Sequence, residues 1–233
     1  KRQLLSISFL LLLPPAGFKA LASHVPAAKN KTISTDNTAE ALYSQMNLAE
    51  AGLSKAAFDY AYKGYRYLLK HQKLGTPGIL TICDMSQSSV RRRLYILDMN
   101  ENRILYESYV AHGKGSGMEY ATRFSNRANS HQSSLGFYIT GNTYVGEHGL
   151  SLRLRGLEAG FNDHATRRNI VVHGADYIGN ANPDNRFMGR SYGCPAVPQA
   201  ESQEIIDLIK NGTCLFIYHP NTTYFKRSKI LNG

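Results

Sequence analysis

The feature that most constrains the fold of this sequence is a series of short apolar runs separated by turn-forming residues, beginning at residue 79. Runs of this length, bounded by Gly, Asn, Asp and Ser, are typical of β-strands. The runs cover residues 79–83, 93–97, 104–110, 135–140, 150–154, 170–173 and 213–218, and residues 100–102 read as a hairpin turn. The sequence therefore predicts a mostly β fold, a sandwich or barrel, with peripheral helices.

The helical signals lie outside these runs. Residues 38–50 and residues 55–72 carry apolar side chains at three- and four-residue spacing, and Ser54 is a suitable N-cap for the second helix. We expect the aromatic stripe of this helix to pack in the core. A further short helix is expected at residues 203–210, and Asn211-Gly212 ends it.

The start of the chain resembles an export signal. Lys1-Arg2 precede an apolar run at residues 4–13, which is shorter than the roughly 20 residues that a membrane-spanning helix needs. Ala20-Leu21-Ala22 then fits a cleavage site, although an uncleaved N-terminal anchor is the alternative. We expect an exported protein of the bacterial periplasm or cell envelope. The expected organisation is a signal peptide at 1–22, a flexible lead at 23–36, a helical segment at 37–75, a catalytic domain at 76–220 and a tail at 221–233.

The stretch from residue 170 to residue 198 carries the chemistry. A short apolar strand is predicted to end on His173, and a loop rich in Asn, Asp and Gly then delivers Cys194. A cysteine is a nucleophile as its thiolate, and a neighbouring imidazole can act as the base. Gly174 would free the backbone after the strand, and Gly193 would let a substrate carbonyl approach main-chain N–H groups. Pro195 is expected to limit regular structure after the cysteine.

Other interpretations of these two residues remain open from the spacing alone. Cys194 fits a buried apolar side chain or half of a disulfide, and His173 fits a histidine satisfied by a backbone partner. The chain has three cysteines, so a thiol at Cys194 would leave Cys83 and Cys214 either bridged or buried and reduced. A Cys194–Cys214 bridge would silence the site.

This stretch is similar to the active-site signature of the L,D-transpeptidase (YkuD-like) catalytic domain of bacterial cell-wall enzymes. The similarity rests on His-Gly at 173–174 followed by Ser-x-Gly-Cys-Pro-Ala-Val-Pro at 191–198, and it extends over residues 53–218. Further motifs that support it are Val-Ala-His-Gly at 110–113, Phe-Ser-Asn at 124–126, Ser-Ser-Leu-Gly-Phe-Tyr at 133–138 and Ser-Leu-Arg-Leu at 151–154. The resemblance implies a YkuD-like mixed β-sandwich with the catalytic loop at one edge.

The resemblance also implies roles for individual residues. Cys194 would be the nucleophile and His173 its base, with a thiol pKa lowered to ~3.5–7.5 by the usual Cys/His coupling. The amides of Gly193 and Cys194 would be the oxyanion donors. The group that orients His173 would be a backbone carbonyl or one of three aspartates, at positions 163, 176 and 184.

Three residues of the loop are expected to bind substrate, each with an alternative. Ser191 would contact substrate or orient the loop, Arg190 would pair with a substrate carboxylate or lie on the surface, and Tyr192 would form a wall of the site. Many members of the family have an arginine two positions after the cysteine, whereas this chain has Ala196. That difference puts in doubt the transfer of substrate contacts from the better-known branch.

The implied reaction is acyl transfer between peptidoglycan stem peptides, which gives a 3→3 cross-link, with no cofactor. Water as the acceptor would give L,D-carboxypeptidase activity instead, and carbapenem acylation of Cys194 is a further expectation. A non-catalytic wall-binding module is an alternative. A papain-like protease is disfavoured because its cysteine normally precedes its histidine.

We expect structural roles for the remaining basic clusters and histidines. The formal charge is +10, but no nucleic-acid motif accompanies it. Its two clusters, residues 91–93 and 167–168, are expected at solvated strand edges. His112 followed by Gly113 admits a metal site with His173 and Cys194, but the other histidines lack ligand spacing, so we favour packing of His112 beneath the active-site loop.

Overall fold

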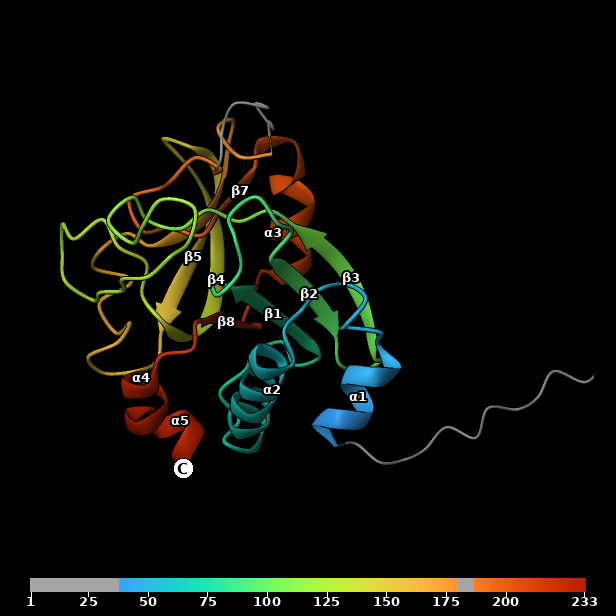
Figure 1. The fold of residues 1–233 in the computed structure, drawn as a ribbon. Coiled ribbons are helices and arrows are strands. Elements are labelled where there is room, and N and C mark those ends of the chain that lie inside the picture. Colours follow the sequence, from blue (N-terminus) through green and yellow to red (C-terminus); the bar gives the residue numbers. More distant parts are fainter. Residues whose placement is uncertain (1–37, 180–186) are drawn as a thin grey trace, which may run out of the picture. The chain divides into compact units, whose positions relative to one another are not determined.

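The computed structural model describes residues 38–179 and 187–233, which belong to one compact unit, Asp36–Gly233. The signal peptide and flexible lead predicted at residues 1–36 lie outside the described residues. Eight strands form one sheet in the order β3-β2-β1-β8-β4-β5-β6-β7 (Figure 1). The strands are β1 (Ile79–Asp84), β2 (Leu94–Asp98), β3 (Arg103–Ser108), β4 (Gly136–Gly146), β5 (Gly149–Gly156), β6 (Val171–Ala175), β7 (Ala196–Pro198) and β8 (Cys214–Tyr218).

The sheet is mixed, because β1 pairs with β8 and β6 pairs with β7 in parallel while the other neighbours are antiparallel. The prediction of a mostly β, YkuD-like fold with peripheral helices is therefore confirmed. Strands β1 to β6 and β8 are the predicted ones, with shifted ends, and β7 was not predicted. It begins two residues after Cys194 and has three residues, so a short strand does follow Pro195, which was expected to limit regular structure there.

Two helices precede the sheet, as the apolar spacing predicted. The side chain of Thr38 caps α1 (Ala39–Gln45), and the side chain of Ser54 caps α2 (Lys55–Lys70). The buried face of α2 includes Phe58, Tyr65 and Leu68, and this face packs against β1 and β8. The boundary expected between residues 75 and 76 therefore lies within one compact unit. Of the helices in the described ranges, none has both the length and the apolar character needed to cross a bilayer.

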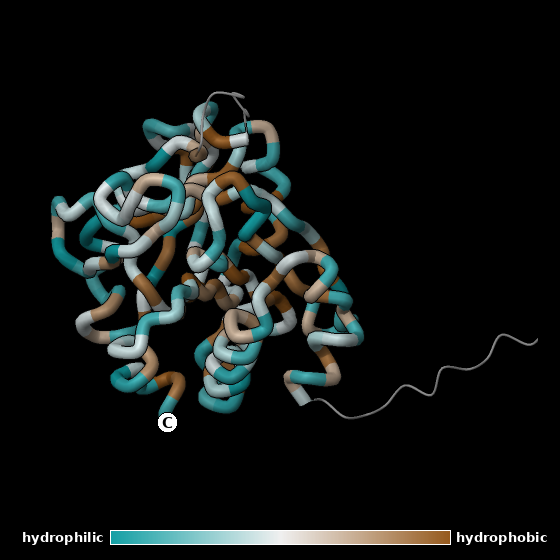
Figure 2. Tube along the Cα trace, viewed as in Figure 1, coloured by the Kyte–Doolittle hydropathy of each residue, from teal (hydrophilic) through white to brown (hydrophobic). Residues whose placement is uncertain are grey.

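The core is centred on β1, β8 and the first half of β4. All five residues of β8 are buried, and Phe216 of this strand stacks on Phe137 of β4 with ring centroids 4.1 Å apart. Cys83 and Cys214 lie on β1 and β8, fully buried and unbridged. Apolar residues gather along these central strands (Figure 2). Burial of such side chains supplies most of the stability of a fold of this kind.

Strand β6, next to the edge strand β7, packs against η1 (Gln199–Glu201) and α3 (Ser202–Ile209). Gly174 lies inside β6, and a side chain there would meet Gln199 Oε1 at 2.4 Å. Gly174 was expected to free the backbone after the strand. In the structure, the absence of a side chain at Gly174 allows close packing instead.

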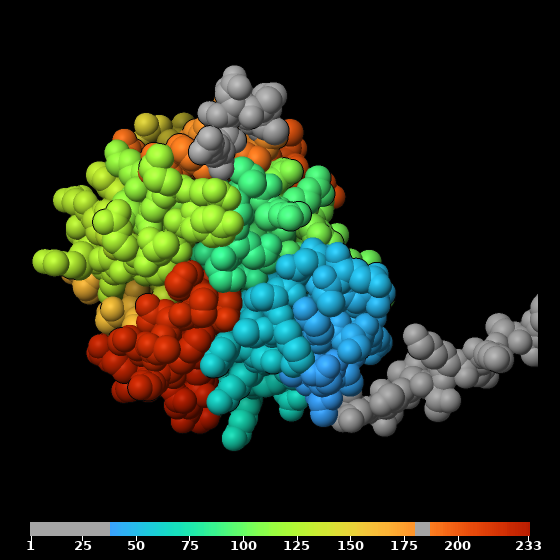
Figure 3. Space-filling view, in the orientation of Figure 1, coloured from blue at the N-terminus to red at the C-terminus, as the bar shows by residue number. Residues whose placement is uncertain are grey.

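The C-terminal residues are not the predicted tail. They form α4 (Thr222–Arg227) and α5 (Lys229–Asn232), which lie beside α2 (Figure 3). The buried carboxylate of Glu158 fixes them: it accepts hydrogen bonds from Tyr224 Oη (2.7 Å), Ser228 Oγ and the backbone N–H of Phe137 (2.8 Å). Because residues 219–223 are polar, no apolar pattern at the start of this segment indicated the packing.

Candidate active site

Strand pairing brings the predicted cysteine and histidine to the same place. In the parallel pair β6·β7, His173 is opposite Ala196 and Gly174 is opposite Val197. Cys194 lies two residues before Ala196, on the segment that enters β7. The loop does fold back as the sequence predicted, but His173 lies in the middle of β6 rather than at its end. A central position holds the imidazole more firmly than a loop would.

The hydrogen bonding of His173 defines its tautomer. Nδ1 lies 2.8 Å from the carbonyl oxygen of Gly174, which can only accept, so Nδ1 carries the proton and Nε2 is left as an acceptor. A backbone carbonyl therefore orients the ring, which was one of the two predicted solutions. The ring is buried, and burial lowers the pKa of His173, with protonation of the nearby His148 acting in the same direction.

Cys194 is half-buried, and its Sγ donates to the carbonyl oxygen of Asn169 (3.6 Å). Burial raises the pKa of the Cys194 thiol, and the backbone of Val171 and the charge of Arg168 only partly oppose it. The expectation of a lowered pKa is therefore wrong for this state, in which cysteine is a neutral thiol. Cys194 and Cys214 are both free, which also excludes the bridge between them.

Ser191 and Gly193 shape the loop around the thiol. The Ser191 hydroxyl donates to the carbonyl of Cys194 (2.6 Å) and accepts from the N–H of Gly193 (3.0 Å). Gly193 has φ +124°, and a side chain there would meet Gln132 O at 2.7 Å, so only glycine fits.

These contacts correct one predicted role and choose between two others. The Gly193 N–H is occupied by Ser191, so it does not serve as the predicted oxyanion donor, and the Ser191 hydroxyl orients the loop, which is one of the two roles expected of it. Within the described residues, the N–H of Cys194 donates to no other protein atom, so this amide is the one available to an oxyanion.

A buried polar layer supports the loop from below. Ser191 forms a bridge with Gly113 and donates its N–H to His112 O (3.0 Å). The Arg93 guanidinium donates to His112 Nδ1 (2.8 Å), and the pKa of His112 falls to about 4 because of burial and that positive charge. His112 is thus a neutral packing residue beneath the loop, as expected.

The basic clusters are not both solvated. Arg93 is fully buried, with hydrogen bonds to the carbonyls of Val110 (2.9 Å from Nη2) and Gln87 (2.8 Å). Arg168 is half-buried beside the catalytic loop. Both contradict the predicted strand-edge positions. Their partners are backbone carbonyls and hydroxyls, which leave no charge pattern in the sequence.

The other two predicted substrate-binding residues differ in position. Arg190 donates from Nη1 to the carbonyls of Lys114 (3.4 Å) and Gly117 (3.0 Å), so its guanidinium ties two loops together. Tyr192 is 65% exposed and packs against His131, with tilted rings whose centroids are 4.6 Å apart. Tyr192 therefore remains a candidate wall of the site, whereas the structure gives Arg190 a loop-binding position.

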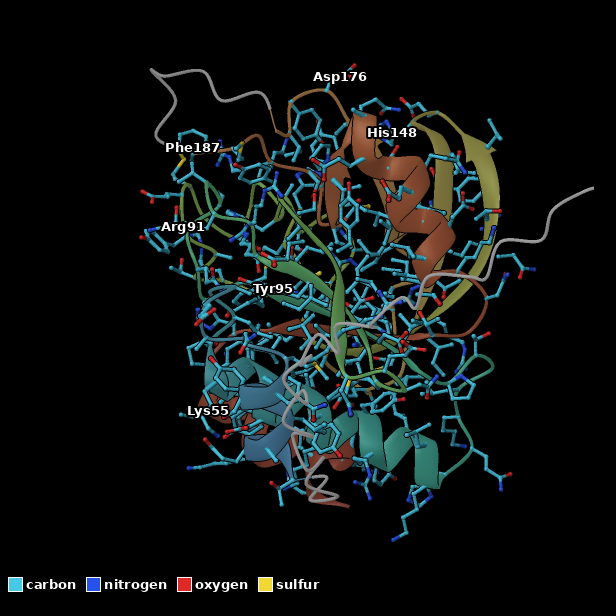
Figure 4. All side chains as sticks on the ribbon, turned by 90° about the vertical axis from the view of Figure 1, so that its right-hand side faces the viewer. Lys55, Arg91, Tyr95, His148, Asp176 and Phe187 are labelled. Carbon is cyan, nitrogen blue, oxygen red and sulfur yellow. The ribbon has the colours of Figure 1, made fainter. Side chains whose placement is uncertain are left out.

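His148 was not predicted to belong to this site. The residue lies in the turn between β4 and β5, and its ring stacks on that of His173 at 4.3 Å with an interplanar angle of 21°. Figure 4 shows His148 and Asp176 at the same end of the unit, far from Lys55. Nothing in the sequence indicated that the tip of the β4–β5 hairpin reaches β6.

A metal site finds no support in the described part of the chain. No three His, Cys, Asp or Glu side chains are grouped there as metal ligands. His112 is directed at Arg93 and Gly117, with Nε2 3.4 Å from Gly117 O.

Comparison with known proteins gives a consistent family. Residues 49–218 match the L,D-transpeptidase catalytic domain family. No curated protein matches the chain. An L,D-transpeptidase from Mycobacterium smegmatis is 10% identical with a TM-score of 0.39, and the match covers 61% of this chain and 59% of that one. The LD transpeptidase LdtMt1 in complex with imipenem is 11% identical (TM-score 0.37; 60% and 59% covered). An L,D-transpeptidase (residues 123–326) from Xylanimonas cellulosilytica is 18% identical (TM-score 0.36; 77% and 93% covered). This chain spans about three fifths of the length of the first two structures.

Proposed function

Because the chain belongs to the L,D-transpeptidase catalytic domain family, we propose that it transfers acyl groups between peptidoglycan stem peptides through a thioester on Cys194. The observation that supports the proposal is the β6·β7 pairing, in which Cys194 leads into the strand next to that of His173, a histidine whose Nδ1 is already bound. This arrangement supplies a nucleophile and an oriented base, the two requirements of covalent acyl transfer.

The first half-reaction starts from a neutral pair. A thiol with a raised pKa and an imidazole with a lowered pKa both stay uncharged near neutral pH. His173 Nε2 takes the proton of Cys194 as the sulfur attacks the carbonyl carbon of the third stem residue. The N–H of Cys194 stabilises the oxyanion. The intermediate then collapses, the terminal residue leaves with the proton from His173, and a thioester remains.

The second half-reaction decides the product. An amine of a second stem attacks the thioester, gives its proton to His173, and forms a 3→3 cross-link as the thiolate leaves and is reprotonated. Water in place of the amine gives L,D-carboxypeptidase activity, the second candidate. A half-buried sulfur favours transfer to an amine, because exclusion of water from the thioester slows hydrolysis.

Two further expectations belong to this proposal. The solved complex of LdtMt1 with imipenem supports the expectation that carbapenems acylate Cys194 in this chain. Export to the periplasm or cell envelope, where the substrate is found, rests on the leader-like composition of residues 1–22.

The test uses a disaccharide-tetrapeptide, with products identified by mass spectrometry. We expect loss of the terminal residue together with a cross-linked dimer, and we expect Cys194→Ala to abolish both. Cys83→Ala is the matched control, because this thiol is buried in β1 away from the catalytic loop, and it should retain activity. Release of the terminal residue without a dimer would select the carboxypeptidase. Turnover that survives Cys194→Ala would refute the thioester.

A further inference from the structure

A cavity of about 280 Å³ opens next to the catalytic cysteine. Its walls include His131, Arg167, Arg168, Asn169 and Tyr192. The cavity adjoins the reactive sulfur, since the carbonyl of Asn169 accepts from Cys194 Sγ at 3.6 Å and Tyr192 lies two residues before Cys194. It also adjoins the loop backbone, because Arg168 Nη2 lies 3.3 Å from the position of a Cβ on Gly193.

The cavity is cationic, and its charges have no acidic partner. Neither Arg167 nor Arg168 forms a salt bridge within residues 38–179 and 187–233. The nearest acid along the chain, Asp163, accepts from Asn126 (2.7 Å) and from the N–H of Gly160 (2.7 Å). Two uncompensated guanidinium groups beside a nucleophile favour an anionic group of the substrate.

The guanidinium groups of Arg167 and Arg168 differ in how they are bound by the protein. The terminal N–H groups of Arg168 are bound by oxygens of Ser125, Ser130, Gln132 and Ser134, so this side chain is rigid and supplies charge. Arg167 is exposed, and its Nη2 lies 3.0 Å from His164 Nδ1. Its other guanidinium donors have no partner among the described residues. Arg167 can therefore present a planar pair of donors to a carboxylate.

Tyr192 belongs both to the catalytic loop and to the wall of the cavity. Its ring packs against Lys114, whose Nζ lies 4.1 Å from the ring centroid, and against His131, whose ring centroid lies 4.6 Å away.

Resting on the proposed function, we propose that this cavity binds the C-terminal carboxylate of the donor stem peptide, with Arg167 as the hydrogen-bonding residue and Arg168 as a fixed charge. The attacked carbonyl and the terminal carboxylate of a tetrapeptide are one residue apart, about 3.5 Å along an extended chain. Asn169, whose carbonyl lies 3.6 Å from Cys194 Sγ, lines the cavity together with Arg167 and Arg168, so a carbonyl placed at the sulfur leaves the carboxylate at the mouth of this cavity.

The experiment compares two donors that differ only at the terminus, a tetrapeptide acid and the corresponding carboxamide. The wild-type chain should prefer the acid by about 10- to 100-fold in kcat/KM, the range of a charge-assisted hydrogen bond. Arg167→Ala should lower kcat/KM for the acid by the same factor and leave the carboxamide unchanged. Arg103→Ala, on the β3 edge of the sheet, removes an equal charge and should change neither value. An equal loss for both donors would overturn the proposal.

A binding measurement separates this proposal from the proposed reaction. In the Cys194→Ala background, calorimetry should show tighter binding of the acid than of the carboxamide, and Arg167→Ala should abolish the difference. If the wild-type chain turns over neither donor, the proposed reaction fails while this measurement still decides the carboxylate site. Equal affinity for the two peptides, no binding of either, or a preference that depends only on the side-chain carboxylate of the third residue would each refute the site.

Discussion

Arg93 lies under the active-site loops and Glu158 lies between the sheet and the C-terminal helices, and both are buried without a salt bridge in the described residues. Each is compensated by neutral dipoles. Arg93 donates to carbonyls and to His112, whereas Glu158 accepts from two hydroxyls and one backbone N–H. Burial lowers the pKa of Arg93 to about 10 and raises the pKa of Glu158.

The two networks differ in what they hold. The Arg93 network leads through His112 to the backbone of Ser191, whose hydroxyl contacts the carbonyl of Cys194. The Glu158 network joins the start of β4, through the N–H of Phe137, to Tyr224 of α4 and to Ser228, the capping residue between α4 and α5. A disturbance of the first network therefore reaches the catalytic loop, whereas a disturbance of the second reaches the packing of α4 and α5 on the start of β4. Stability and catalysis should separate along this division.

The largest effect is expected from replacing each buried charge by methionine. Arg93→Met leaves the carbonyls of Gln87 and Val110 without donors, and Glu158→Met leaves the Tyr224 and Ser228 hydroxyls and an N–H without an acceptor. Each variant should lose on the order of 2–4 kcal/mol of unfolding free energy, as measured with denaturant.

Activity distinguishes these two variants. At a temperature where both are folded by circular dichroism, Arg93→Met should lower kcat by about 10- to 100-fold, because small displacements of reacting groups are costly. Glu158→Met should keep kcat within about twofold of the wild-type value. Similar kcat values for the two variants would remove the functional difference between the networks.

A smaller and closer comparison removes one buried hydroxyl from each region. Ser133 Oγ accepts from the N–H of Gly113 (3.0 Å) and donates to Gly193 O (3.4 Å), while Tyr224 Oη donates to Glu158 (2.7 Å). Ser133→Ala and Tyr224→Phe should each lose about 1 kcal/mol of stability. Only Ser133→Ala should lower kcat, by about three- to tenfold, measured as release of the terminal residue. An equal decrease in kcat for Tyr224→Phe would show that the C-terminal helices also control the site.

Much of this fold follows from local patterns, and the supports of the site do not. Apolar runs bounded by turn residues predicted β1 to β6 and β8. The signal is continuous in β1, β2, β6 and β8, because these strands are buried almost throughout. The strand β7 has only three residues and follows a proline, so its pairing with β6 is decided by tertiary contacts. The turn signals likewise predicted the loop that returns Cys194 towards His173.

The charged residues mark the limit of sequence reasoning here. Arg93 and Arg168 stand in basic runs that are typical of solvated surfaces, yet their partners are carbonyls and hydroxyls of loops distant in sequence. Gly193 was expected to let a substrate carbonyl approach the main chain, and its φ of +124° shows that the loop conformation itself requires a glycine. Its N–H is bound by Ser191, a contact between residues two apart that depends on the loop conformation.

The smallest effect is expected from the histidine pair at the site, with a ring-packed histidine of the helical region as control. His148 stacks on His173 with ring centroids 4.3 Å apart, and His71 packs against Tyr67 with tilted rings whose centroids are 4.2 Å apart. The base must be neutral, so kcat/KM rises with pH through the pKa of His173, which burial and His148 hold below its ordinary value of 6.5.

His148→Phe keeps an aromatic ring on His173 but removes the neighbouring positive charge. The rising limb of the pH profile should therefore move to higher pH by a few tenths of a unit while remaining below pH 6.5, because burial still lowers the pKa. His71→Phe should leave the limb in place. Since a packing defect alone lowers kcat without moving this limb, an unmoved limb in His148→Phe, or a shift towards acid, would show that His148 contributes only contact area.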